Sequence, residues 1–290
     1  MTASTTARSR RIEGLGEVTP LYDAVLCDVW GVLHNGVRAW AGAIEALRAF
    51  RETGPVVMIT NAPRPAGPVL TQLTGLGVPD GTFDAIVTSG DVTRTLIARA
   101  DGPIHHIGTE NELSLYDGLD VTHASEDEAR TIVCTGLRDD ESEEPADYAN
   151  ELSRLVSRGL PMICANPDIV VERGDRLAWC AGALARDYRA LGGRTAIAGK
   201  PHAPIYERAM ELAAEVAGRP LDRSRVLAIG DGMPTDVKGA QDNGFPLLYV
   251  SAGIHSHEYG DPDAPDAERL DAFLAENGAR PEHTLPRLVP

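Results

Sequence analysis

The chain has 290 residues, 43% of them hydrophobic, which is enough for a sizeable core in one large domain or two moderate ones. Its 27 Lys and Arg residues against 43 Asp and Glu residues give a formal net charge of -16, which disfavours nucleic acid and anionic membrane surfaces as partners. No apolar run reaches the roughly 18 residues of a membrane span, and we expect residues 1–11 to form a frayed tail. Four cysteines without CxxC spacing predict reduced core thiols in a cytoplasmic protein.

The first hundred residues alternate between short apolar runs and helical patterns. The runs DAVLCDV, PVVMIT and DAIVT are each followed by a segment with helical spacing. This alternation is typical of βαβ units with a parallel sheet. The pattern returns after residue 190, where TAIAG, RVLAIG and PLLYV are predicted core strands.

A helix is predicted near residues 203–217, between the first two of these late strands. Gly218 and Pro220 follow it and are expected to end it. Its apolar face is expected to hold Ile205, Ala209, Leu212, Ala213 and Val216. A helix with such a face covers one side of a sheet.

The middle of the chain, residues 102–190, has strand and helix patterns of its own. We therefore predict an α/β fold in which a Rossmann-like parallel-sheet core is built from residues 1–101 and 191–290. Residues 102–190 are the expected inserted α/β cap domain.

Polar residues follow the four predicted core strands with the strongest patterns. Asp28 follows the first, Thr60 and Asn61 the second, Lys200 the TAIAG strand, and Asp231 the next, with Asp236 five positions later. Each of these alone is ordinary turn chemistry. The carboxyl ends of parallel strands meet at one edge of a sheet, however, so the side chains are expected to converge there. Carboxylates brought together need a divalent cation, and oxygen ligands suit Mg²⁺.

The segments LCDVWGVL, VMITNAP, GKP and IGDGMPTD resemble, in order, the four motifs of the haloacid dehalogenase superfamily of aspartate-nucleophile phosphohydrolases. The insertion, with ANPDIVV just before the third motif, resembles class II members of the NagD-like type, which include sugar-phosphate, nucleotide and pyridoxal phosphatases. The resemblance implies a Mg²⁺-dependent hydrolase of a small phosphorylated metabolite. It also suggests a homodimer formed through the cap.

By this resemblance, Asp28 corresponds to the nucleophile that becomes an aspartyl phosphate. Thr60 and the backbone of Asn61 and Ala62 correspond to the phosphate cradle, and Lys200 would neutralise the nucleophile and the phosphoryl oxygens.

The resemblance assigns Mg²⁺ to Asp28, Asp231 and the backbone carbonyl of Trp30. Asp236 would be a further ligand or a residue that orients one. Arg64 could contact an anionic substrate, and Asn166 and Asp168 resemble a cap segment near the site, although Arg64 could equally be a surface residue and Asp168 a turn cap.

Trp30 departs from the family pattern, in which this position carries an aspartate that protonates the leaving oxygen. General acid–base catalysis contributes about 10²- to 10⁴-fold, so three alternatives stay open. His34 could transfer the proton instead, the substrate could have a leaving group that needs little protonation, or the chain could resemble the superfamily's dehalogenases, whose DVYGTL sequence is similar to DVWGVL. A protein that binds a phosphometabolite or a partner without catalysis is the rival from another class.

Overall fold

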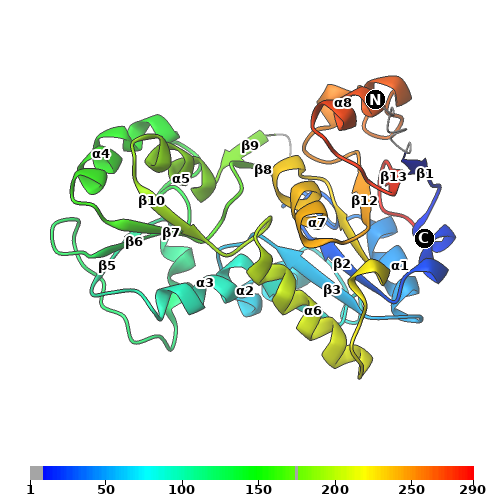
Figure 1. The fold of residues 1–290 in the computed structure, drawn as a ribbon, viewed down its shortest axis with the longest axis horizontal. Coiled ribbons are helices and arrows are strands. Elements are labelled where there is room, and N and C mark those ends of the chain that lie inside the picture. The colour runs from blue at the N-terminus through cyan, green and yellow to red at the C-terminus, as the bar shows by residue number, and fades with distance from the viewer. Residues whose placement is uncertain (1–8, 174–175) are drawn as a thin grey trace, which may run out of the picture.

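The computed structural model describes residues 9–173 and 176–290, which form two parallel sheets and a small hairpin (Figure 1). The core sheet has the order β1-β13-β12-β11-β2-β3-β4, and the second sheet has the order β10-β7-β6-β5. The core strands are β1 (Arg10–Arg11), β2 (Ala24–Asp28), β3 (Val56–Thr60), β4 (Ala85–Thr88), β11 (Val226–Gly230), β12 (Leu247–Val250) and β13 (His283–Leu285). The strands of the second sheet are β5 (Ile104–Ile107), β6 (Thr131–Cys134), β7 (Pro161–Cys164) and β10 (Arg194–Ile197).

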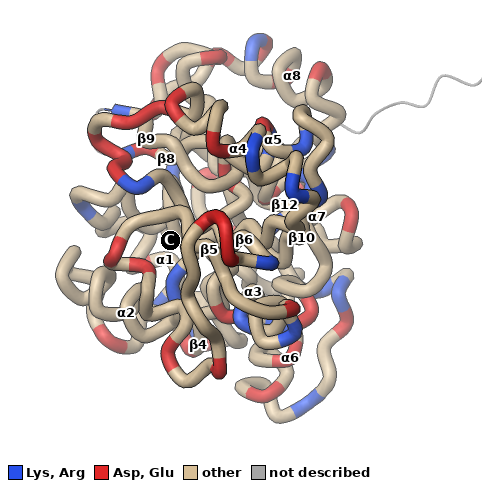
Figure 2. Tube along the Cα trace, turned by 90° about the vertical axis from the view of Figure 1, so that its left-hand side faces the viewer, with Lys and Arg blue, Asp and Glu red and all other residues tan. Residues whose placement is uncertain are grey.

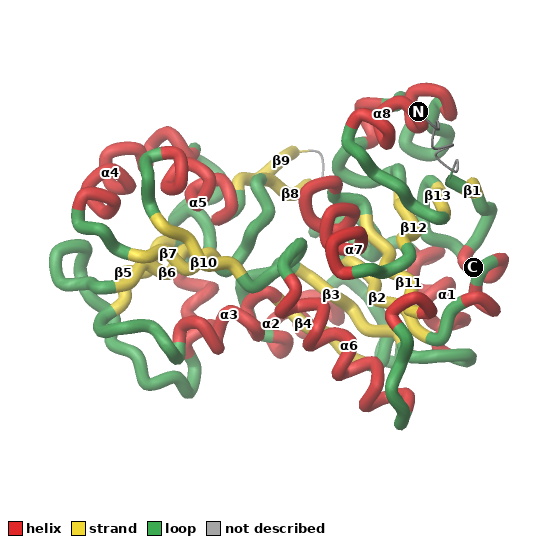
Figure 3. The backbone as a smooth tube through the Cα atoms, viewed as in Figure 1, coloured by secondary structure: helices red, strands yellow, loops and turns green. Residues whose placement is uncertain are grey.

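Helices cover both faces of the core sheet, as Figure 3 shows. Successive residues of β2 alternate between the two faces. Val25 and Cys27 pack in one apolar cluster, and Ala24 and Leu26 pack in the other. Burial on both faces explains why this strand is continuously apolar. The first cluster contains α1 (Ala41–Arg51) and α2 (Ala66–Gly75), and the second contains α6 (Ala203–Ala217), α7 (Lys238–Asn243) and α8 (Ala267–Glu276).

Helix α6 has the predicted bounds, and Gly218 ends it in the left-handed conformation with φ 66°. Ile205, Ala209 and Ala213 are buried as predicted. The prediction for Val216 is wrong, since this residue is 47% exposed. It lies in the last turn, which projects past the sheet (Figure 1).

The second sheet has its own apolar core. Helices α4 (Ala149–Ser157) and α5 (Ala181–Ala190) pack on one face of it, and Ile97 at the end of α3 (Ser89–Ile97) packs on the other. The antiparallel hairpin of β8 (Val170–Arg173) and β9 (Arg176–Trp179) stands between this sheet and the core (Figure 1). We refer to residues 102–197, which include the second sheet and this hairpin, as the cap.

Two expectations from the sequence are corrected. The strand at 194–197 was expected in the core sheet, but it pairs with β7 in the second sheet. Its residues are exposed or half-buried, which suits the edge of a small sheet rather than the middle of a core. Arg10 and Arg11, expected within a frayed tail, form β1 against β13, while residues 1–8 of that tail lie outside the described residues.

The acidic residues that the structure describes do not gather on one face (Figure 2). Acidic positions are spread over many loops and are interspersed with basic ones (Figure 2). Among the described residues, no helix is long and apolar enough to span a membrane. All four cysteines are buried and free.

Candidate active site

Three buried aspartates converge at the carboxyl edge of the core sheet. Asp28 is the last residue of β2, Asp231 follows β11 directly, and Asp236 lies in a helical turn five residues further on. Each offers a carboxylate oxygen, and these atoms lie within 4.8 Å of one another. Because β2 and β11 are paired parallel neighbours, their ends bring the first two aspartates together.

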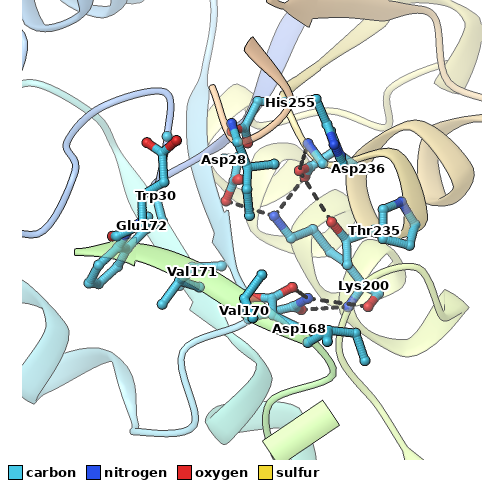
Figure 4. A pocket seen from close by; sticks show the side chains of 18 residues that line it. Asp28, Trp30, Asp168, Val170, Val171, Glu172, Lys200, Thr235, Asp236 and His255 are labelled. Atoms are coloured by element: carbon cyan, nitrogen blue, oxygen red, sulfur yellow. Dashed lines mark hydrogen bonds and ion pairs between the residues drawn. The ribbon is translucent and has the colours of Figure 1, made fainter. Parts of the chain in front are cut away.

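Lys200 lies between two of these carboxylates (Figure 4). Its Nζ is 2.7 Å from Asp28 Oδ1 and 2.6 Å from Asp236 Oδ1, and the lysine is 2% exposed. Burial opposes its charge, but Asp236 and Asp28 together raise the pKa of Lys200 well above its ordinary value. The lysine is therefore a fixed cation within the cluster.

One ammonium does not balance three carboxylates. Burial, and then the charge of Asp236, raise the pKa of Asp28 well above its ordinary value and the pKa of Asp231 to about 8. Both shifts express the cost of adjacent anions in a buried site. A hard divalent cation would remove that cost, and the donor set of carboxylate oxygens fits Mg²⁺. The residues present therefore suit the metal expected from the sequence.

Two glycines let Asp231 sit where it does. A Cβ on Gly31, which has φ +84°, or on Gly253 would overlap the carboxylate of Asp231. The N–H of Ile254 donates to Asp231 Oδ2 at 2.8 Å. Sequence reasoning missed Gly253 and Ile254 because they follow β12, whose end carries no acidic or basic residue to mark it.

The residues after β3 tie the site together. The side-chain oxygen of Asn61 accepts from the N–H of Lys200 at 2.8 Å, and its Nδ2 donates to Asp168 Oδ1 at 2.8 Å. Thr60 Oγ1 accepts from the N–H of Ala62 at 3.3 Å. Asn61 thereby connects the lysine loop to the cap.

The side chain of Trp30 reaches the cap. Its indole N–H donates to the carbonyl of Glu172 in β8. Its ring meets the ring of His34 edge-on, with 4.9 Å between the centroids. The indole N–H is the only hydrogen-bonding group of this side chain, so the contact with Glu172 uses all of its capacity.

His34 packs against the ring of Trp30 and is buried. It is 2% exposed, its Nδ1 accepts from the N–H of Gly36 at 2.9 Å, and burial lowers its pKa to about 4. His34 lines neither of the two clefts that open beside the aspartates. The structure does not bring it to the aspartates.

Two adjoining clefts open beside the aspartates. The first encloses about 780 Å³, its mouth included, and is lined by the three aspartates and Lys200, with Glu172 and His255 that sequence reasoning missed. The second lies between the core and the cap and is lined by Arg64 and Asn166 among others. Arg64 also donates to Gln72 Oε1 at 2.6 Å, and Asn166 Oδ1 accepts from the N–H of Asp168 at 3.0 Å.

Known proteins resemble this chain in sequence and in fold. Residues 25–122 match the family described as haloacid dehalogenase-like hydrolase, and residues 197–284 match the one described as HAD-hydrolase-like. A crystallised hydrolase of the haloacid dehalogenase-like family from Brucella suis 1330 is 52% identical, with a TM-score of 0.87 over 96% of this chain and 100% of that one.

More distant relatives carry specific names. The D-glycerol 3-phosphate phosphatase of Mycobacterium tuberculosis is 30% identical over 248 residues, which cover 81% of this chain but 64% of that protein. NagD from E. coli K-12 is 22% identical, with a TM-score of 0.66 over 92% of this chain and 96% of NagD, which shows a shared fold.

Proposed function

Because the chain belongs to the haloacid dehalogenase-like hydrolase family, we propose that it hydrolyses a small phosphate monoester through a phosphorylated Asp28. The observation that carries the proposal is the buried group of three carboxylates around Lys200. The names of relatives support the substrate class, since they include D-glycerol 3-phosphate phosphatase and acid sugar phosphatase. A sugar phosphate, a nucleotide and pyridoxal phosphate are the candidate substrates.

The residues divide the work as follows. Asp28 Oδ1 accepts from Lys200 Nζ and from the N–H of Val29, both at 2.7 Å, which leaves Oδ2 to attack phosphorus. Lys200 offsets the charge of the phosphoryl oxygens, and the hydroxyl of Thr60 donates to one of them.

Asp28, Asp231, Asp236 and the carbonyl of Trp30 would hold Mg²⁺. The ion, when bound, supplies positive charge against the phosphoryl oxygens. The acidic protein would otherwise repel an anionic substrate, so the metal and Lys200 together make phosphate binding possible.

Trp30 favours a second candidate, a protein that binds a phosphometabolite or a partner and turns over slowly or not at all. Its indole N–H is engaged with the cap, and it offers no carboxyl to protonate the leaving oxygen. The dehalogenase alternative has the likeness of DVWGVL in its favour, whereas the three carboxylates favour a metal-dependent phosphatase. We also propose that the protein is cytoplasmic and that it forms a homodimer. Light scattering would test the homodimer.

The deciding experiment measures phosphate release from a panel of esters with Mg²⁺ by the wild type, Asp28→Asn and Trp30→Asp. Release that disappears with EDTA and with Asp28→Asn supports the proposal. If the wild type and Asp28→Asn are equally inert while Trp30→Asp gains activity, the binding protein is the better description. Chloride release from 2-haloacids without metal would overturn the phosphatase.

A further inference from the structure

The two clefts beside the aspartates meet at a narrow set of residues. Trp30, Thr60, Asp168 and Val171 line both of them. Under the proposed function the first cleft, which holds Asp28, receives the phosphoryl group, and the adjoining second cleft offers room for the rest of the ester. The bridging oxygen of such a substrate would lie next to these four residues.

Asp168 carries the only carboxyl group among those four residues. Trp30 occupies the position from which family members usually protonate the leaving oxygen, and its N–H is already donated to the cap. We infer that Asp168, supplied by the cap, is the general acid that protonates the leaving oxygen in place of a residue at position 30. The inference rests on the proposed phosphatase function and names the catalytic group that the core lacks.

The backbone around Asp168 is held firmly. Its N–H donates to Asn166 Oδ1 at 3.0 Å, and its carbonyl accepts from the N–H of Gly182 at 3.0 Å. A Cβ on Gly182 would overlap that carbonyl, so the start of α5 lies directly against the segment. The carboxyl group is fixed as well, since Oδ1 accepts from Asn61 Nδ2 at 2.8 Å (Figure 4). Oδ2 is then the oxygen that carries the proton.

The surroundings of Asp168 allow it to hold a proton near neutral pH. Burial raises its pKa to about 6, the charge of Lys200 and the hydrogen bond from Asn61 act in the opposite direction, and the charge of Asp236 adds to the rise. The thiols of Cys164 and Cys180 also face it, and burial raises the pKa of each, so both are neutral. A general acid works best when its pKa lies near the working pH.

Both half-reactions balance with this residue. As Asp28 Oδ2 bonds to phosphorus, the bond from phosphorus to the ester oxygen breaks, and that oxygen keeps the electron pair and takes the proton of Asp168, leaving as an alcohol. Water then attacks the phosphorus and gives a proton to the Asp168 carboxylate, while the bond from phosphorus to Asp28 breaks. Phosphate is released and Asp168 is protonated again.

The test compares esters that differ in their need for a proton. p-Nitrophenyl phosphate releases a stable phenolate, whereas glycerol 3-phosphate releases an alkoxide unless it is protonated. For Asp168→Asn we expect kcat/KM, which reports the steps up to departure of the alcohol, to fall by about 10²- to 10⁴-fold on the alkyl ester and by less than about tenfold on the phenyl ester. Asp168→Glu should restore part of the rate on the alkyl ester. The control is Glu172→Gln, which removes a second cap carboxyl that lines the first cleft and should slow the hydrolysis of both esters by one common factor.

The pH profile gives a second readout. In the wild type, kcat/KM on the alkyl ester should fall as the pH rises through the pKa of Asp168, and this limb should be missing in Asp168→Asn. Equal losses of kcat/KM on both esters in Asp168→Asn would overturn the inference, because they would indicate a residue that only positions Asn61. So would a selective loss in Glu172→Gln, or a wild type that acts only on the phenyl ester. Phosphate release independent of Asp28 would instead refute the proposed function itself.

Discussion

Replacing Lys200 by methionine removes the one ammonium that holds Asp28 and Asp236 together. The side chains of Lys200, Asp28 and Asp236 are 2%, 9% and 6% exposed, so little water can take the place of the ammonium between the two carboxylates. Removing one partner of a buried ion pair costs about 3–5 kcal/mol, because an uncompensated charge stays behind. We therefore expect Lys200→Met to lower the free energy of unfolding at pH 7 without metal by about 3–5 kcal/mol.

Urea unfolding measures this loss. With a denaturant slope of about 1–3 kcal/mol/M, the midpoint should fall by at least about 1 M. The matched control is Lys238→Met, since Lys238 also lies 2.6 Å from an aspartate, Asp242, but both are more than half exposed. That variant should lose at most about 1 kcal/mol. Adding Asp236→Asn to Lys200→Met should recover part of the stability, and equal losses in Lys200→Met and Lys238→Met would refute the reasoning.

Three further outcomes follow from the site. Gly253→Ala should weaken Mg²⁺ binding, because the new methyl group overlaps the Asp231 carboxylate, whereas Gly244→Ala, whose methyl group meets no atom within 4 Å, should leave the affinity for Mg²⁺ unchanged. Equal affinities of the two variants in calorimetric titration would contradict this. Trp30→Phe should lower the free energy of unfolding by about 0.5–1.5 kcal/mol, since a phenyl ring replaces the indole and no N–H is left to donate to the carbonyl of Glu172; an unchanged urea midpoint would argue against that contact. Mg²⁺ at a hundredfold excess over its dissociation constant should stabilise the wild type by about 2.7 kcal/mol, and a melting temperature that ignores both Mg²⁺ and EDTA would contradict the metal site.

The sequence predicts the α/β fold and the convergence of Asp28 and Asp231, because each stands at or just after the end of a core strand. Lys200 also reaches the site, but it was predicted there for the wrong reason, since the strand before it belongs to the second sheet. The sequence does not predict which sheet a short strand joins. The run at 194–197 is four residues long and was placed in the wrong sheet, since a pattern of that length carries no information about its neighbours.

Local sequence patterns also do not predict contacts between residues that are far apart in the chain. Trp30 donates to Glu172, 142 positions away, and nothing near either residue signals the pair. His34 is close to Trp30 in sequence and was proposed for proton transfer on that ground, yet its side chain is buried away from both clefts. The order of residues along the chain therefore identified the motif that contains Asp28 and Trp30, but it did not identify the side chains and carbonyl groups that surround this motif in the fold.

In the proposed reaction, Asp28 forms a covalent bond to phosphorus. Acid quenching during turnover of a phosphate ester with Mg²⁺, followed by mass spectrometry of the peptide that contains Asp28, tests it directly. We expect one phosphoryl group on Asp28 in the wild type and none in Asp28→Asn, whose phosphate release should be lost. Turnover at the wild-type rate in Asp28→Asn, or a phosphoryl group found on another residue, would contradict the account.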